Sequence, residues 1–178
     1  MGLPLVGNSI YKPQLITDYP DGFMLIIDTR ESDPLFFRAG KSRKNVPIIR
    51  KTLTYGDYSV LGFEEQLSVE RKKAGDLVAC LGREWKRFEK ELGGLKDMER
   101  KYILVECYEE EVYFSHSCQL YMQSKGKTGT APNAVRQSIA SIEMKLGVPF
   151  HYSPNRTATE IWIMDRFVKY YQWKRGGK

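Results

Sequence analysis

The distribution of apolar residues between positions 23 and 72 predicts a buried strand followed by a β-hairpin. Residues 23–27 form an uninterrupted apolar run that ends at Asp28, which is typical of a strand buried on both faces. Residues 52–60 are rich in β-branched and aromatic residues, and residues 66–72 alternate between polar and apolar. The short, glycine-containing segment between them predicts a hairpin whose tip lies at Phe63 and Glu64.

The periodicity changes after residue 76 and predicts helices that alternate with strands. Apolar residues recur at helical spacing at Leu77, Leu81, Trp85, Phe88 and Leu92. This stripe predicts one helix that is capped by Asp76, interrupted at Gly82 and ended by the glycines at 93–94. Residues 102–106 then form an apolar run closed by an acid, which predicts another buried strand.

The last third of the chain predicts two more helices around a short strand. Pro132 opens a helix that continues to about Leu146, and residues 148–152 form the strand. The sequence Thr157-Ala-Thr-Glu160 is a capping box, and it predicts the start of the last helix. Residues 1–20 carry several prolines and little periodicity, which predicts an irregular arm before a single α/β domain at 21–178.

Composition and charge narrow the class of protein. The 178 residues are 42% hydrophobic and carry a net charge of +6, which predicts a globular domain with a polyanionic partner. The three cysteines match no metal-binding or redox spacing, so we expect reduced thiols. The sequence shows no secretory signal and no long apolar run, and we therefore expect a cytoplasmic protein that does not span a membrane.

The predicted hairpin brings charged residues together. Because side chains alternate between the faces of a strand, Glu70 and Lys72 share one face and Arg71 lies on the other. With the tip at residues 63–64, Asp57 lies opposite Glu70. Two carboxylates and an ammonium at one place suit phosphodiester hydrolysis with Mg²⁺, because carboxylates hold the ion and the ammonium positions a water. Taken alone, the pattern favours a solvated strand face with ordinary charges, because such short patterns are common.

Two blocks of residues make the pattern longer and more specific. Gly56-Asp57 is followed after twelve residues by Glu70-Arg71-Lys72, and Asp76 follows after three more. Upstream, Ile27-Asp28-Thr-Arg30-Glu31 ends the first predicted strand. These blocks resemble the GD…ERKxxxD and D-x-R-E motifs of the XPF-type endonucleases, a branch of the PD-(D/E)XK superfamily. The resemblance covers about residues 23–172 and favours a nuclease site over a solvated face.

The resemblance implies a PD-(D/E)XK restriction-endonuclease-like α/β fold, in which helices flank a central mixed β-sheet. It implies a Mg²⁺- or Mn²⁺-dependent DNA endonuclease whose products carry a 5′-phosphate and a 3′-hydroxyl. The implied metal ligands are Asp57, Glu70 and the Arg71 carbonyl, and Lys72 orients or activates the attacking water. The other implied site residues are the acids Asp28 and Glu31 and the phosphate-binding cations Arg30, Lys73 and Arg83.

The same resemblance indicates the partners and leaves alternatives. The expected partner is DNA, with flaps, forks or junctions as preferred structures in repair, recombination or replication. Related nuclease modules form homodimers, which implies a homodimer here. Many of them also adjoin a helix-hairpin-helix domain that targets them to DNA. The residues up to Lys178 contain no such domain, so we expect a partner protein to supply the targeting. The stretch Ser32-Asp-Pro-Leu-Phe-Phe37 resembles that of compact stand-alone bacterial or phage members, which implies a cytoplasmic protein associated with the nucleoid. A non-catalytic DNA-binding or scaffolding subunit, and a junction resolvase or exonuclease of the same fold, stay open as alternatives.

Overall fold

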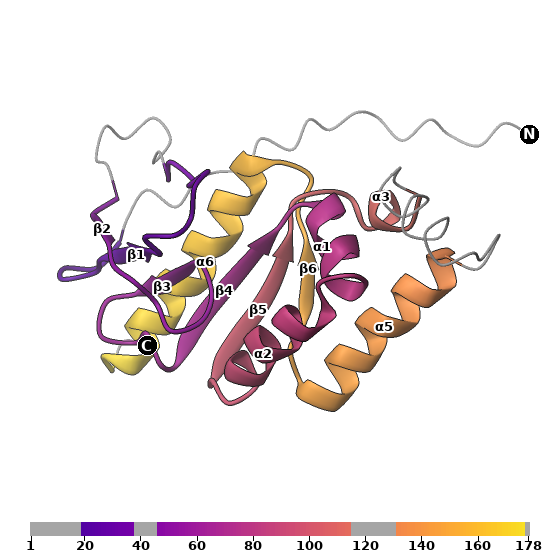
Figure 1. The fold of residues 1–178 in the computed structure, drawn as a ribbon. Helices are drawn as coiled ribbons and strands as arrows, with labels where there is room; N and C mark the ends of the chain where they lie inside the picture. The colour runs from indigo at the N-terminus through magenta and orange to yellow at the C-terminus, as the bar shows by residue number, and fades with distance from the viewer. Residues whose placement is uncertain (1–18, 38–45, 115–130, 177–178) are drawn as a thin grey trace, which may run out of the picture.

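One six-stranded sheet forms the centre of the molecule (Figure 1). The computed structural model describes residues 19–37, 46–114 and 131–176, so most of the predicted arm at 1–20 lies outside the described residues. The strands are β1 (Leu25–Ile27), β2 (Ile48–Arg50), β3 (Tyr58–Val60), β4 (Leu67–Lys72), β5 (Arg100–Val105) and β6 (Phe150–Tyr152). Their spatial order is β2-β1-β3-β4-β5-β6, with β3 antiparallel to both β1 and β4 and the other neighbours parallel. The predicted mixed sheet is confirmed.

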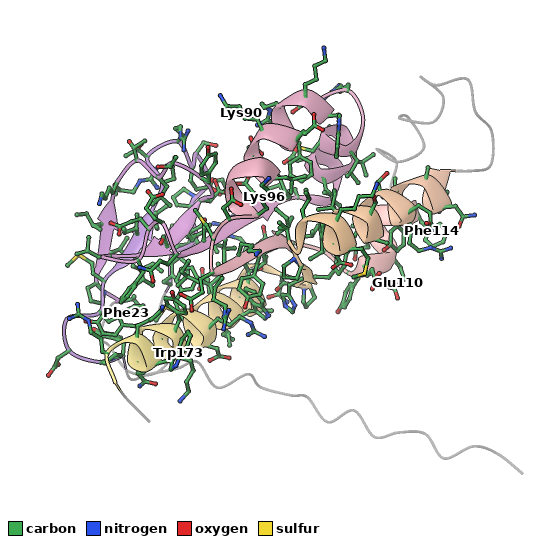
Figure 2. All side chains as sticks on the ribbon, turned by 90° about the horizontal axis from the view of Figure 1, so that it is seen from below. Phe23, Lys90, Lys96, Glu110, Phe114 and Trp173 are labelled. Atoms are coloured by element: carbon green, nitrogen blue, oxygen red, sulfur yellow. The ribbon has the colours of Figure 1, made fainter. Side chains whose placement is uncertain are left out.

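Helices cover both faces of this sheet (Figure 1). On one face lie α1 (Ala74–Leu81), α2 (Trp85–Leu95), α3 (Glu109–Phe114) and α5 (Ala131–Leu146), and on the other lies α6 (Arg156–Lys174). The alternation of β5 explains the two layers, because Ile103 and Val105 enter the α1–α2–α5 core while Leu104 enters the α6 core. From below, side chains fill both layers and Lys90 on α2 points away from the sheet (Figure 2). The predicted α/β fold with a flanked central sheet is therefore correct.

The hairpin has the predicted register. Tyr58 lies opposite Val69, so the midpoint of the turn falls between Phe63 and Glu64. The strand β3 is shorter than the predicted segment 52–60, since it contains only Tyr58–Val60. No helix among the described residues is long and apolar enough to cross a membrane.

The helix predicted after the hairpin is in fact two helices. The first ends at Leu81, and the second begins at Trp85 and continues through both glycines at 93–94. Those glycines do not end the helix; a Cβ on Gly94 would lie 2.2 Å from the ring carbons of Tyr55, so glycine is needed there for close packing. Asp76 is not the cap either, because α1 starts after Lys73 and places Asp76 inside the first turn.

The last helix also begins differently from the prediction. Its N-cap is Asn155, whose side chain accepts a hydrogen bond of 3.0 Å from the Ala158 amide. The supposed capping-box residue Glu160 instead accepts a bond of 3.0 Å from the Phe36 amide. The large apolar residues Met164 and Phe167 of α6 are buried in the core, so they are not available for a dimer interface. Strand β2 and helix α3 were not predicted, because three and six residues carry too little periodicity.

Candidate active site

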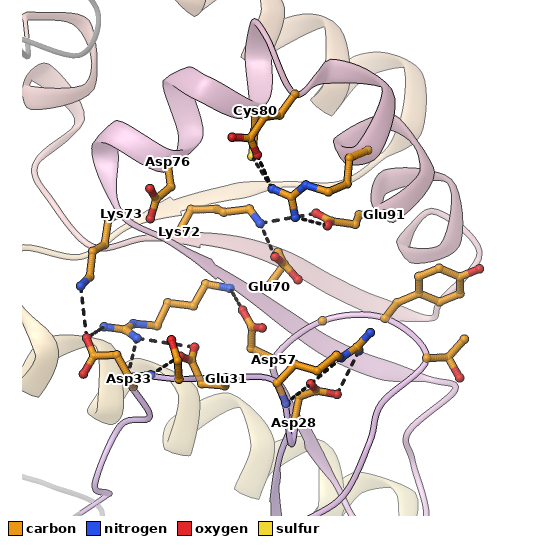
Figure 3. A pocket seen from close by; sticks show the side chains of 18 residues that line it. Asp28, Glu31, Asp33, Asp57, Glu70, Lys72, Lys73, Asp76, Cys80 and Glu91 are labelled. Carbon is orange, nitrogen blue, oxygen red and sulfur yellow. Dashed lines mark hydrogen bonds and ion pairs between the residues drawn. The ribbon is translucent and has the colours of Figure 1, made fainter.

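A cleft of about 430 Å³ opens at the carboxyl end of β4 (Figure 3). Helices α1 and α2 border it on one side, and the loop after β1 borders it on the other (Figure 3). The side chains around it are mostly charged: Asp28, Arg30, Glu31, Asp33, Asp57, Glu70, Arg71, Lys72, Lys73, Asp76, Glu84, Arg87 and Glu91. Segments far apart in sequence therefore bring most of the predicted site residues to one cleft.

Gly56 allows Asp57 to approach β4 closely. Its φ is +80°, and a Cβ there would lie 1.9 Å from the Ser68 hydroxyl oxygen, so only glycine fits. The Asp57 amide donates to the Val69 carbonyl at 2.9 Å, and one Asp57 carboxylate oxygen accepts from the Arg71 amide at 2.8 Å. Asp57 is thus bonded to main-chain groups on both sides of Glu70, through its amide to Val69 and through its carboxylate to Arg71, as the predicted register requires.

Asp57 and Glu70 are two carboxylates that oppose each other's ionisation. Burial raises the pKa of Asp57 well above its ordinary value, and the charge of Glu70 raises it further, against the hydrogen bond from the Arg71 amide. Burial likewise raises the pKa of Glu70, although the Lys72 ammonium opposes this. The pair is short of positive charge, which is the electrostatic condition that a bound cation relieves.

Lys72 extends along the same face of β4 as Glu70. Its ammonium donates a short hydrogen bond to Glu70 and lies 3.4 Å from a carboxylate oxygen of Glu91. Burial alone would lower the pKa of Lys72, but the charge of Glu70, its hydrogen bond and the charge of Glu91 raise it. The ammonium therefore stays charged, and it can donate hydrogen bonds or offset negative charge.

Asp28 is occupied by donors and does not point freely into the cleft. Its carboxylate accepts from the Arg30 amide at 2.7 Å, from the Arg30 side chain at 2.8 and 3.0 Å, and from the Leu53 amide at 2.6 Å. Burial alone would raise the pKa of Asp28, but these hydrogen bonds outweigh it and the pKa is lowered. In this structure Asp28 anchors Arg30 and the segment before the hairpin at the edge of the cleft.

Arg71 ties several acidic residues together beneath the cleft. Its guanidinium forms a short ion pair with Glu106, lies 3.6 Å from Glu31 and donates to the Asp33 carbonyl at 2.8 Å. Its main-chain amide points toward Asp57, and the amide and carbonyl of one strand residue point the same way. The Arg71 carbonyl therefore faces Asp57, while Glu31 is engaged with the Arg71 side chain.

The cations of the cleft differ from those predicted at one position. Arg30 and Lys73 line it, with side chains 65% and 61% exposed, but Arg83 does not and instead lies 3.6 Å from Glu84. Its place is taken by Arg87, whose side chain is 59% exposed and bonds Glu84 at 2.5 Å and Glu91 at 2.9 Å. The spacings of three and four residues to these acids were a signal in the sequence for Arg87.

The donor set suits a hard divalent cation. Among the described residues, no group of three or more His, Cys, Asp or Glu side chains is arranged to hold a metal ion. Mg²⁺ does not need such a group, because it is commonly held by one or two carboxylates and keeps several waters. Asp57 and Glu70 lie side by side with raised pKa values, and the Arg71 carbonyl faces them. These residues fit a Mg²⁺ or Mn²⁺ ion.

Solved structures resemble this fold over most of the chain. XPF from Aeropyrum pernix in complex with DNA matches with a TM-score of 0.59 and 17% identity, covering 85% of this chain and 66% of that chain. A second structure of XPF from Aeropyrum pernix matches with a TM-score of 0.61 and 17% identity, covering 87% of this chain and 64% of that one. At this identity the likeness establishes the fold, and the chain spans slightly under two thirds of these structures' length.

Sequence comparison agrees with the structural likeness. No curated protein matches the chain. The model of the ERCC4 domain matches residues 27–165, which include the Asp28 block at the end of β1, the hairpin with Asp57 and Glu70, and both helices that border the cleft, α1 and α2. Because the match covers well over half of the sequence and the XPF-like fold accompanies it, the chain belongs to the ERCC4 domain family.

Proposed function

We propose that this protein is a divalent-metal-dependent endonuclease that hydrolyses phosphodiester bonds in DNA. The observation that carries the proposal is the juxtaposition of Asp57 and Glu70, both with raised pKa values, beside the charged ammonium of Lys72. Such a set is unfavourable unless a cation is bound, which is typical of sites kept for function. Family membership supports the same chemistry.

Asp57, Glu70 and the Arg71 carbonyl are the residues that would hold Mg²⁺ or Mn²⁺. When bound, such an ion polarises a phosphoryl oxygen and lowers the pKa of a coordinated water. Lys72 is charged in this structure, and its ammonium can orient the attacking water or stabilise charge on the phosphate. Asp28 and Glu31 act by positioning Arg30 and Arg71, respectively.

The exposed cations at the border of the cleft provide the substrate side of the site. Arg30, Lys73 and Arg87 surround the acidic floor with guanidinium and ammonium groups that face solvent. Phosphates of a DNA strand would contact these cations while a scissile phosphate lies against the floor. We propose branched DNA in repair, recombination or replication as the substrate, in the prokaryotic cytoplasm, with a homodimer or a DNA-targeting partner supplying further contacts.

The competing proposal is a DNA-binding subunit without catalysis. One of the similar solved structures is a complex with DNA, which is compatible with both proposals. The presence of Asp57, Glu70 and Lys72 together in one cleft favours catalysis, because binding alone needs no buried acids that repel the DNA.

Cleavage of labelled flap, fork, four-way junction and linear duplex DNA, with Mg²⁺, Mn²⁺ or EDTA, tests the proposal. We expect metal-dependent cleavage that is lost in Asp57→Asn, Glu70→Gln and Lys72→Ala. Glu89→Gln is the matched control, since Glu89 is exposed on α2 and does not line the cleft. DNA binding without cleavage in any metal would support the subunit alternative, and unchanged cleavage in Asp57→Asn and Glu70→Gln would remove the assigned site.

A further inference from the structure

Glu91 belongs to the cleft, although neither motif contains it. It lies on α2, and its carboxylate reaches both Lys72, at 3.4 Å, and Arg87, at 2.9 Å. Its side chain is 26% exposed, compared with 9% for Glu70, so it faces the cleft from the solvent side. Lys72 therefore lies between two carboxylates, of which Glu70 is the nearer.

The nearer carboxylate has two competing uses. In this structure Glu70 is the principal counter-ion of Lys72, yet the proposed function requires Glu70 to ligate a divalent cation. A cation and an ammonium on one carboxylate repel each other, so binding the cation weakens the hold of Glu70 on Lys72. Lys72 is buried, and a buried ammonium without a counter-ion is costly. The Lys72 side chain would then move out of the cleft, or its charge would weaken binding of the cation.

We propose that Glu91 is the positioning residue of Lys72, which takes over as its counter-ion when Glu70 binds a divalent cation. This inference rests on the proposed function, because Lys72 needs a second counter-ion only if Glu70 is a metal ligand. A carboxylate 3.4 Å away needs only a small side-chain movement to form the stronger contact. The lysine then remains aimed at the cleft while Glu70 turns to the cation.

Neighbouring residues of α2 fix the position of Glu91 close to Lys72. Arg87 binds it one helical turn away and is itself bound by Glu84 at 2.5 Å, which forms a row of charges along α2. The buried side chains of Phe88 and Leu92 anchor the adjacent face of the helix in the core. The ring of Phe88 also lies 5.6 Å from the Lys72 ammonium, so α2 contributes both an acid and an aromatic ring to the lysine.

A double-mutant cycle on metal binding tests this role separately from DNA cleavage. The dissociation constant of Mn²⁺ is measured by calorimetry for the unmutated protein, Glu91→Gln, Lys72→Met and the double variant, with melting curves to confirm folding. We expect Glu91→Gln to weaken Mn²⁺ binding about tenfold, the usual size for a residue that supports a metal ligand. With Lys72→Met the same substitution should weaken it only about twofold, because no ammonium then needs a counter-ion.

Kinetics and controls complete the test. At saturating metal, Glu91→Gln should lower kcat about tenfold with little change in KM for DNA, and Glu91→Asp should restore part of the loss. Glu89→Gln, which removes the same charge from an exposed position of α2, should match the unmutated protein. Equal weakening of Mn²⁺ binding with and without Lys72 would overturn the inference, as would unchanged Mn²⁺ binding in Glu91→Gln. The predicted coupling in a protein that cleaves no DNA would uphold the role of Glu91 and reject the endonuclease proposal.

Discussion

The main-chain amide of Arg71 donates a 2.8 Å hydrogen bond to the carboxylate of Asp57, 14 positions earlier in the chain. This bond joins the two halves of the hairpin at the cleft and favours the ionised form of Asp57, although burial and Glu70 still raise the pKa of Asp57 above its ordinary value. The donor is a main-chain amide, so the bond can persist in any Asp57 substitution that keeps an acceptor oxygen in the side chain. Asp57→Asn is therefore a clean way to remove the charge alone.

In EDTA we expect Asp57→Asn to melt at or above the temperature of the unmutated protein, because the repulsion from Glu70 is gone. Metal at about ten times its dissociation constant stabilises the unmutated protein by roughly 1.4 kcal/mol. That corresponds to an increase in Tm of roughly 3 to 6 °C for a domain of this size. The variant should lose most of that increase. Melting curves in EDTA and in Mn²⁺ measure both effects.

Asp28→Asn provides the contrast for that experiment. Its carboxylate accepts four hydrogen bonds, so we expect a loss of about 2 kcal/mol of stability, whether or not metal is present. An Asp57→Asn protein that is destabilised in EDTA, or that keeps the full metal effect, would make Asp57 a structural residue and not a ligand.

Neutralising Arg87 should weaken DNA binding more than neutralising Arg83. Arg87 lines the cleft, whereas Arg83 is 81% exposed outside it. Removing one phosphate contact reduces the slope of log K against log salt by about 0.9. We expect this change for Arg87→Gln and a much smaller one for Arg83→Gln, measured by fluorescence anisotropy on duplex DNA across a salt series. Equal changes in the two slopes would place the DNA on the outer side of the α1–α2 junction.

The two glycines of α2 should respond oppositely to alanine. Gly93 has open space around its Cα, so Gly93→Ala gains about 0.5 to 1 kcal/mol of helix stability. Gly94→Ala places its Cβ 2.2 Å from the Tyr55 ring, which must move out of the border of the cleft. We expect Gly94→Ala to be less stable than Gly93→Ala by about 1 to 3 kcal/mol in urea denaturation. In a Tyr55→Ala background this difference should disappear; if it persists, Tyr55 is not its cause.

The stability of the protein should fall as the pH falls from about 6.5 toward 4, because the pKa of His151 is lower in the folded than in the unfolded protein. Burial, and then the charge of Arg166, lower its pKa to about 4 in the folded state, from 6.5 in the unfolded chain. The unfolded chain therefore binds the proton first on acidification, and stability present above pH 6.5 is lost as the pH falls. We expect a loss of about 2 kcal/mol between pH 7 and 4.5 that is absent in His151→Phe. Phenylalanine retains a ring against Trp162, which lies 4.3 Å from the imidazole centroid. Urea denaturation curves whose pH dependence is the same in both proteins would contradict this.

The hairpin and its chemistry were predictable because they depend on local rules. Alternation along β4 places Glu70 and Lys72 on one face whatever surrounds the strand, and their ion pair agrees with this. The turn length determines the register, which brings Asp57 beside β4. Gly56 precedes Asp57 because a side chain at that point would collide with Ser68. The short segment from Gly56 to Lys72 therefore determined the acidic floor of the cleft, and it also carries the motif by which the sequence resembles its family.

Tertiary structure decided which other charged residues join that floor. Arg83 and Arg87 lie on consecutive turns of the single helix that the sequence predicts, but a break separates α1 from α2, and only Arg87 lines the cleft. Asp28 is an acid of the kind that binds metals, but its carboxylate oxygens already accept hydrogen bonds from Arg30 and from the Leu53 amide. Glu91 belongs to neither sequence motif, and its proposed role depends on how α2 packs over Lys72. These outcomes depend on distances between segments that are far apart in sequence, and the packing of helices on a sheet, not local periodicity, determines such distances.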